Sequence, residues 1–195
     1  MKKFIFLTVL VILGIAISNA QTETKTTTFR WGPTAGVNFS GASGDIDDID
    51  GRTGLRAGVA ASLEISELFS VQPEVVYSMR GWKEQNLTIK IDYVEVPVMA
   101  DFEVYDGLSL QGGPIIGFNI SAEVVNGMTV DIQDDVESVS FGAAIGAQYV
   151  LPMGLFFNLR YDMGINNINA NDNEFGDEFV IRNCNLGLSA GFYID

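Results

Sequence analysis

The sequence contains no histidine and a single cysteine, Cys184. Without histidine, Ser-His-Asp and Cys-His nucleophiles and most catalytic zinc sites are excluded, because each needs an imidazole that titrates near neutral pH or binds the metal. One cysteine can form neither an internal disulfide nor a four-cysteine metal site, so Cys184 is expected to be a small apolar packing residue. The chain therefore lacks side chains on which much hydrolytic and metal chemistry depends.

Positive charge is scarce as well, since 11 Lys and Arg stand against 25 Asp and Glu and give a net charge of -14. Phosphates repel a chain with this excess of negative charge, which excludes a nucleic-acid binder of the usual electrostatic type. After the first twenty residues no run approaches about 18 consecutive apolar residues, so no membrane-spanning helix is expected there.

The first twenty residues have the pattern of a secretory signal peptide. Two lysines precede a mostly apolar run that ends in Ser18-Asn19-Ala20, a small-x-small cleavage site. The predicted organisation is a signal peptide at 1–20, a short N-terminal segment at 21–29 and one domain at 30–195. Because 47% of the residues are hydrophobic, an exported chain without a membrane helix needs another place for its apolar side chains.

Eight segments alternate apolar and polar residues with a period of two, which is the pattern of a β-strand with one apolar face. In residues 30–40, every odd-numbered residue from Trp31 to Phe39 is apolar, and the even-numbered ones are small, polar or charged. The other predicted strands are 55–66, 71–82, 87–104, 108–121, 138–151, 155–166 and 183–195.

Within 87–104 the alternation changes parity near Asp92-Tyr93. This pattern places Ile89 and Ile91 outward in the first half of the strand and Lys90 and Asp92 inward, while the later half follows the opposite parity. A β-bulge is expected at this point, because one extra residue switches which side chains face which side.

The predicted connections alternate between short and long. Short ones are expected around Glu67, Tyr105-Asp106 and Pro152-Met153, and longer ones at 41–53, 82–86, 122–136 and 168–179. Bacterial transmembrane barrels combine an even number of strands with short turns at one end and long loops at the other. The predicted fold class is therefore all-β, an eight-stranded antiparallel up-and-down transmembrane β-barrel whose narrow lumen is filled by its own side chains. A soluble sandwich or exported barrel with a ligand cavity is the alternative.

Several spaced motifs also resemble one known family. They are Gly36-Val37-Asn38-Phe39-Ser40, Val71-Gln72-Pro73-Glu74-Val75-Val76-Tyr77-Ser78, Tyr93-Val94-Glu95-Val96-Pro97 and Leu159-Arg160-Tyr161 followed by Gly164-Ile165-Asn166-Asn167-Ile168. On these motifs the chain resembles the PorT-like outer-membrane β-barrel family of Gram-negative bacteria, also described as the outer membrane protein beta-barrel domain. The resemblance implies an eight-stranded barrel in the bacterial outer membrane, porin-like and of undetermined role; the secretion role of the name-giving member does not carry over.

Charged residues on the polar faces should pair, because unpaired charge in a water-poor lumen is costly. If the turn near Glu84 sets the register, Glu74 and Glu95 lie roughly opposite each other, and the planar guanidinium of Arg160 is predicted to bridge them. The predicted lumen charge cluster comprises Glu74, Glu95, Arg160, Arg80, Glu64 and Asp162, and the other inward charges are Arg30, Arg56, Lys90 and Asp92.

Two functional interpretations compete with a purely structural cluster. Glu74 and Glu95 could form a general acid and base pair of the kind found in glycosidases, but an eight-stranded lumen leaves no room for a sugar. Rearrangement of the ion pairs could open a narrow aqueous path for ions. No catalytic residue and no cofactor are predicted.

The expected long loops are acidic, with carboxylates in the first, third and fourth of them. The residues are Asp45, Asp47, Asp48 and Asp50, then Glu123, Asp131, Asp134, Asp135 and Glu137, then Asp172, Glu174, Asp177 and Glu178. Hard cations such as Ca²⁺ or Mg²⁺ favour carboxylate oxygens, so the first group is a weak candidate for a metal site. It fails the EF-hand pattern, however, and solvated loops are the favoured interpretation.

The predicted function is a small monomeric outer-membrane barrel of structural or surface-interaction type, without catalysis. Its expected partners are outer-membrane lipids and lipopolysaccharide, the outer-membrane assembly machinery and an unknown extracellular partner of the acidic loops, with no nucleic acid. The alternatives are an outer-membrane lipid-modifying enzyme, a narrow ion-conducting channel and a soluble exported ligand-binding barrel.

Overall fold

The computed structural model describes residues 28–44, 49–84, 87–168 and 180–194, which are almost entirely β-structure. The elements are β1 (Phe29–Gly44), β2 (Ile49–Ser66), β3 (Phe69–Glu84), β4 (Leu87–Tyr105), β5 (Leu108–Asn126), β6 (Met128–Asp131), η2 (Gln133–Asp135), β7 (Val139–Val150), β8 (Leu155–Gly164) and β9 (Ile181–Phe192). The predicted signal peptide and residues 21–27 lie outside the described residues. Within the described ranges, no helix is long and apolar enough to cross a membrane.

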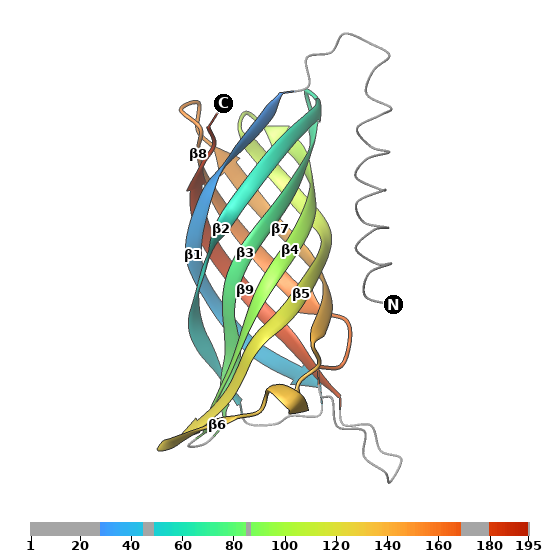
Figure 1. Ribbon diagram of the computed structural model, residues 1–195. Helices are drawn as coiled ribbons and strands as arrows, with labels where there is room; N and C mark the ends of the chain where they lie inside the picture. The colour runs from blue at the N-terminus through green and yellow to red at the C-terminus, as the bar shows by residue number, and fades with distance from the viewer. Residues whose placement is uncertain (1–27, 45–48, 85–86, 169–179, 195) are drawn as a thin grey trace.

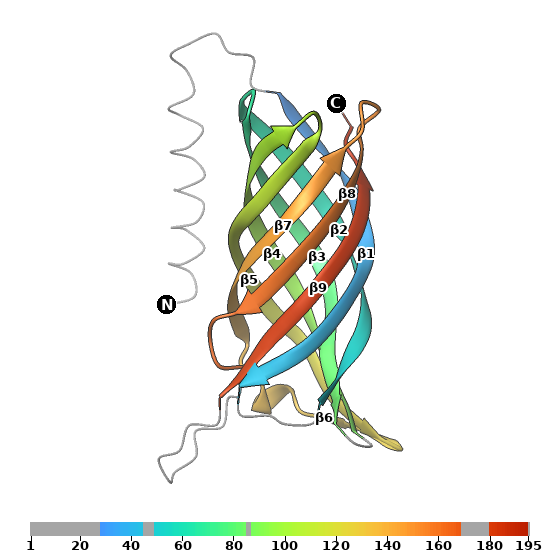
Figure 2. The ribbon, with the colours of Figure 1, turned by 180° about the vertical axis from the view of Figure 1, so that it is seen from behind.

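The strands close into one antiparallel barrel. The sheet order is β4-β3-β2-β1-β9-β8-β7-β5-β6, and an additional pairing of β4 with β5 joins the two sides of the sheet. The short β6 pairs with β5 alone among the described strands and extends past the barrel wall, so the wall itself has eight strands (Figures 1 and 2). The predicted eight-stranded antiparallel barrel is confirmed.

The two ends of the barrel differ in their connections. Tight turns at Glu67–Leu68, Asp106–Gly107 and Leu151–Gly154 lie at the end where the C-terminus emerges, and we call this the short-turn end (Figure 1). Gly107 and Gly154 have positive φ angles of 72° and 89°, which allow these sharp reversals. The longer connections, including β6 and η2, lie at the opposite end, which we call the long-loop end.

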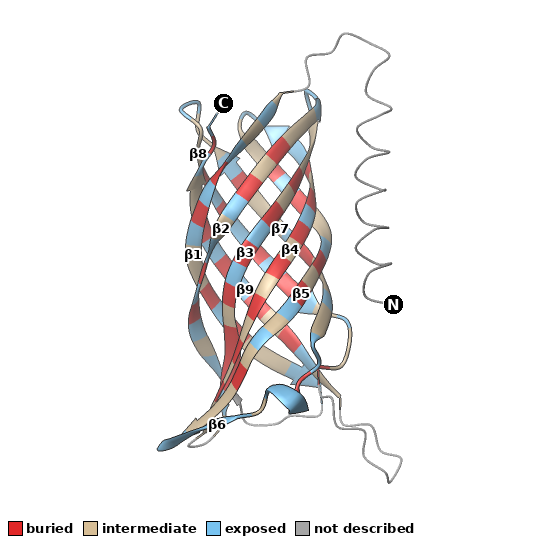
Figure 3. Cartoon of the chain, in the orientation of Figure 1, coloured by how far each residue is buried: buried red, intermediate tan, exposed pale blue. Residues whose placement is uncertain are grey.

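The alternation of side chains places apolar residues outside and polar residues inside. Along the strands, buried and exposed residues follow one another in regular steps (Figure 3). Leu55 is 60% exposed on the outer face, whereas Arg160 is 1% exposed in the lumen. Water-soluble proteins show the reverse, and an apolar outer band around a polar interior is the arrangement of a transmembrane barrel. Cys184, half-buried, belongs to the outer face of β9.

In β4 the predicted change of parity is wrong. Ile89 and Ile91 are buried in the lumen, and Lys90 and Asp92 belong to the outer face, because the strand alternates without interruption down to Asp101. The predicted irregularity does occur at this level, but the extra residue lies in the neighbouring strand. Asp92 pairs with Ser121 and Tyr93 with Asn119, so that the bulged residue is Ile120 of β5.

Candidate functional site

The centre of the lumen holds a carboxylate between two arginines. Glu74 of β3 faces Arg160 of β8, and the guanidinium Nη2 and Nη1 atoms donate to Oε1 at 2.6 Å and to Oε2 at 3.0 Å. Arg56 of β2 donates from Nη2 to Oε2 at 3.3 Å. All three side chains are buried, so this two-pronged contact forms in a water-poor environment where each charge needs its partner.

A second ion-pair group lies nearer the long-loop end. Arg80 of β3 contacts Glu95 of β4 through Nε and Oε1 at 2.7 Å, and its Nη2 donates to Oδ2 of Asp162 in β8 at 2.7 Å. Asn185 of β9 also donates to Asp162, at 2.9 Å. The buried lumen charges among the described residues thus form two groups of three, Glu74 with Arg56 and Arg160, and Arg80 with Glu95 and Asp162, together with Asp101.

The arrangement differs in detail from the bridge expected from sequence. Arg160 contacts Glu74 but not Glu95, which is paired with Arg80 instead. The register explains this, because Glu95 pairs with Val76 and therefore lies one inward position farther along than Glu74. Of the other predicted members, Glu64 lies at the short-turn end against Arg30, with Arg30 Nη2 2.6 Å from Oε1. Lys90 and Asp92 are not in the lumen.

Neutral hydrogen-bonding side chains, which the predicted cluster omitted, tie the central group to the wall. Gln72 donates to Glu74 at 2.6 Å, Arg160 donates to Gln111 at 3.3 Å, and Asn158 donates to the same Gln111 oxygen. The sequence signal for these residues was their position on the polar face of their strands. That signal gives the direction of the side chain but not its partner.

An apolar cluster closes the lumen at the long-loop end. It is formed by Trp82, Ile89, Ile91, Tyr93, Ala122, Val136 and Ile168, and we call it the apolar plug. Val136 and Ile168 come from the β5–β7 and β8–β9 connections, which meet where Glu137 N donates to Ile168 O at 2.9 Å. At its inner edge Asn183 donates to the Tyr93 hydroxyl at 3.0 Å. The plug therefore separates the ion pairs from the water at this end.

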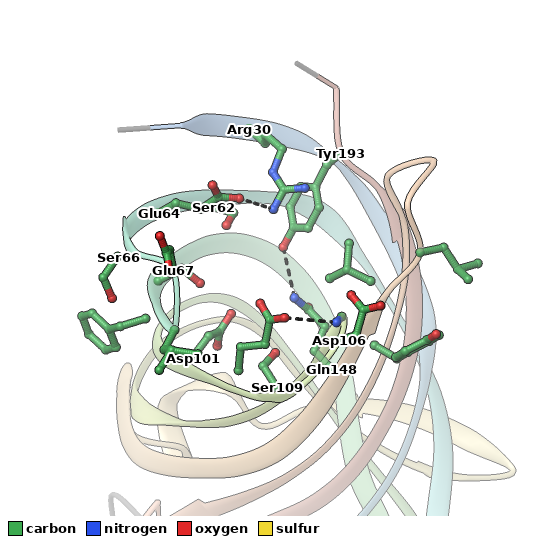
Figure 4. A pocket seen from close by; sticks show the side chains of 18 of the residues that line it. Arg30, Ser62, Glu64, Ser66, Glu67, Asp101, Asp106, Ser109, Gln148 and Tyr193 are labelled. Carbon is green, nitrogen blue, oxygen red and sulfur yellow. Dashed lines mark hydrogen bonds and ion pairs between the residues drawn. The ribbon is translucent and has the colours of Figure 1, made fainter. Parts of the chain in front are cut away.

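Toward the short-turn end the described residues form a smaller apolar cluster of Ala60, Phe156 and Tyr193. Tyr193 lies over Phe156 with ring centroids 4.5 Å apart, and its hydroxyl donates to Gln72 at 2.7 Å. Beyond Tyr193 a cavity of about 400 Å³ lies among the turns (Figure 4), and we call it the short-turn cavity.

The lumen has the geometry of a packed interior and not of a reaction centre. Glu74 and Glu95 each contact an arginine, so they do not form a free pair of carboxylates on either side of a substrate. In the parts of the chain that the structure describes, no group of three or more Asp, Glu, Cys or His could hold a metal ion. Of the acidic first-loop residues, Asp50 is exposed, and Asp45, Asp47 and Asp48 lie outside the described residues.

The fold and the faces of the wall define the class of protein, an outer-membrane β-barrel. The chain belongs to the family described as the outer membrane protein beta-barrel domain, whose model matches residues 19–170. Its location is accordingly the bacterial outer membrane. No curated protein sequence matches the chain.

Three solved structures illustrate the likeness of the fold. Neisserial surface protein A is 16% identical with a TM-score of 0.59, over 83% of this chain and 96% of that one. Ail, the attachment invasion locus protein of Yersinia pestis, is 16% identical with a TM-score of 0.55, over 85% of this chain and 98% of that one. A structure of Ail in complex with the heparin analogue sucrose octasulfate is 15% identical with a TM-score of 0.51, over 85% and 99% of the two chains.

Proposed function

We propose that this protein is a PorT-like outer-membrane barrel that acts at the cell surface as an interaction or structural protein, without catalysis and without a standing channel. The observation that carries the proposal is the packed lumen, in which the ion pairs lie beneath the apolar plug. Ion conduction would require the plug and at least one buried ion pair to move together. Separating a buried ion pair costs free energy, so the lumen is closed to ions at rest.

The long-loop end is proposed to face the outside of the cell. Outer-membrane barrels have short turns on the periplasmic side and longer loops outside, and this chain has that asymmetry. The exposed apolar wall is suited to contact with outer-membrane lipids and lipopolysaccharide. We also propose that the outer-membrane assembly machinery inserts the protein and that it is a monomer. The β5–β6 hairpin extends past the wall at this end (Figure 1) and, among the described residues, offers a surface that a partner can reach.

The chemistry of this rim favours a cationic partner. Exposed carboxylates follow the hairpin tip along the β5–β7 connection, at Asp131, Asp134, Asp135 and Glu137. Met128 and Val130, at 78% and 57% exposed, add apolar contact area beside them. Ail has been crystallised with a heparin analogue, which is a polyanion, but a carboxylate rim repels such a ligand.

The test uses the mature protein in nanodiscs of zwitterionic lipid, with decalysine and heparin as probes. Decalysine is expected to bind at low salt and heparin not to bind. The double variant Asp131→Asn with Asp134→Asn should bind decalysine more weakly, since long-range attraction depends on the rim charge. The matched control is Asp131→Glu with Asp134→Glu, which keeps the charge at the same positions. Heparin binding, equal loss in the control, or step conductance in a planar bilayer would contradict the proposal.

A further inference from the structure

The short-turn cavity is built from elements far apart in the chain. Residues of the β2–β3, β4–β5 and β7–β8 turns surround it, and Tyr193 covers its inner side (Figure 4). Its volume of about 400 Å³ is within the range of small-molecule sites. It lies at the opposite end of the barrel from the proposed partner surface, so binding of that partner does not account for the cavity.

Two buried acceptor atoms at this cavity have no hydrogen-bond partner. They are Oδ1 of Asp101 and Oε1 of Gln148, whose residues are 3% exposed and line the cavity. The Gln148 amide nitrogen donates to the Tyr193 hydroxyl at 3.4 Å, and the Asp101 carboxylate has a hydrogen bond with Gln111. Neither interaction gives a partner to Oε1 of Gln148 or to Oδ1 of Asp101. Buried acceptors without donors are uncommon in folded proteins because each costs free energy. A ligand in the cavity that donates a hydrogen bond to both oxygens would remove this cost.

The charge around the cavity indicates which kind of donor fits. Its lining carries Glu64, Glu67, Asp101, Glu103 and Asp106, and Arg30 is the one base among the described lining residues. Arg30 is already paired with Glu64 at 2.6 Å. The remaining carboxylates are spread from the buried Asp101 to the exposed Asp106 at the mouth. A ligand that meets them has to carry positive charge at more than one point along its length.

The rest of the lining includes serines and Gln148 as well as apolar residues. The apolar residues Leu68, Phe69, Val150, Leu151 and Pro152 offer surface for methylene groups. We propose that the short-turn cavity binds a linear aliphatic polyamine. One terminal ammonium group donates to Asp101 and Gln148 at the base, the methylene chain lies along the apolar residues, and a second ammonium group reaches the carboxylates of Glu67 and Asp106 at the mouth.

The experiment is calorimetric titration of spermidine into the mature protein in zwitterionic micelles, with Mg²⁺ titrated at matched ionic strength. Saturable binding of one spermidine is expected, with no comparable binding of Mg²⁺. Asp101→Asn should weaken the affinity by about tenfold or more, since a charged hydrogen bond at a buried site is lost. Glu84→Gln, which removes one carboxylate at the long-loop end outside both proposed sites, is the matched control and should leave spermidine binding unchanged.

Folding of each variant is checked by the difference in gel mobility between unheated and boiled samples. If Asp101→Asn does not fold, the exposed Asp106→Asn and the neutral Gln148→Leu decide, and each should weaken spermidine binding. Equal binding of Mg²⁺, equal weakening by Glu84→Gln, or unchanged affinity in the folded cavity variants would overturn the proposal. Decalysine binding at the other end is independent of these changes, so the two proposals can fail separately.

Discussion

The two ends of the lumen are built from the same alternation but have opposite character. At the long-loop end the inward positions of β4 are Ile89, Ile91 and Tyr93, and loop residues cover them. At the short-turn end β4 presents Asp101 beside an open cavity. The inward positions of β4 are therefore apolar where loop residues cover them and polar beside the cavity.

The ion pairs separate these two regions. Water can approach from the short-turn cavity, whereas the apolar plug excludes it from the other side. The central pair of Glu74 and Arg160 must therefore satisfy its own charges, and the cost of removing one partner should be the largest of any single change in the lumen.

Arg160→Ala breaks the central ion pair, which lies between the two ends of the lumen. Among the described residues, Glu74 then keeps Arg56, at 3.3 Å, as its one charged partner, and a buried carboxylate is left undercompensated. The free energy of unfolding should fall by about 3 to 5 kcal/mol. The measurement is urea unfolding of the protein in liposomes, followed by tryptophan fluorescence.

Two further variants show whether the loss comes from the buried charge. Arg182→Ala removes an exposed arginine of β9 and should change the free energy of unfolding by no more than about 0.5 kcal/mol. Adding both Glu74→Gln and Arg56→Gln to Arg160→Ala should recover part of the stability, because no charge of the central group is then left unpaired. An unchanged unfolding curve for Arg160→Ala would refute the proposed role of the pair.

A matched pair of tyrosines compares the ends directly. Tyr93→Phe leaves the Asn183 amide without the hydroxyl that accepts from it at 3.0 Å, in a region covered by the plug. This should cost about 1 to 3 kcal/mol of unfolding free energy. Tyr193→Phe removes a hydrogen bond of 2.7 Å to Gln72, but water from the adjoining cavity can replace the lost hydroxyl. Its cost should be below about 1 kcal/mol.

Both variants remove one hydroxyl oxygen and keep the ring, so their difference reports on access to water. The loss of unfolding free energy in each variant is measured by urea unfolding under the conditions used for Arg160→Ala. Equal costs, or a larger cost for Tyr193→Phe, would mean that the two ends are equally dry and that the contrast between them is wrong.

Most of the fold follows from local patterns. A period of two over each segment, together with the alternation of short and long connections, was enough to predict eight strands and which face meets lipid. These signals are reliable because every wall strand is exposed to lipid on one side, so its side chains sort by polarity along the whole strand. Residue Phe29 already belongs to β1, one position before the expected start.

The places where sequence reasoning failed are those where a distant segment changes the environment. Ile89 and Ile91 were expected to face lipid because they are apolar, but Val136 and Ile168 make that part of the lumen apolar as well. Similarly, the bulge was placed in β4, whereas the extra residue is Ile120 of β5. The partner of Arg160 depended on the offset between strands, which alternation alone does not give.

The smallest expected effect concerns Arg30 and Glu64, the ion pair at the mouth of the short-turn cavity. The contact is as short as that of the central pair, 2.6 Å in both, but these side chains are 24% and 38% exposed. A double-mutant cycle with Arg30→Gln and Glu64→Gln should give a coupling below about 1 kcal/mol that shrinks in 1 M salt, because water and ions screen exposed charges. The coupling between Glu74 and Arg160 should resist salt. If both couplings respond to salt alike, distance decides the strength of these pairs and burial does not, and the difference between the two ends loses its energetic meaning.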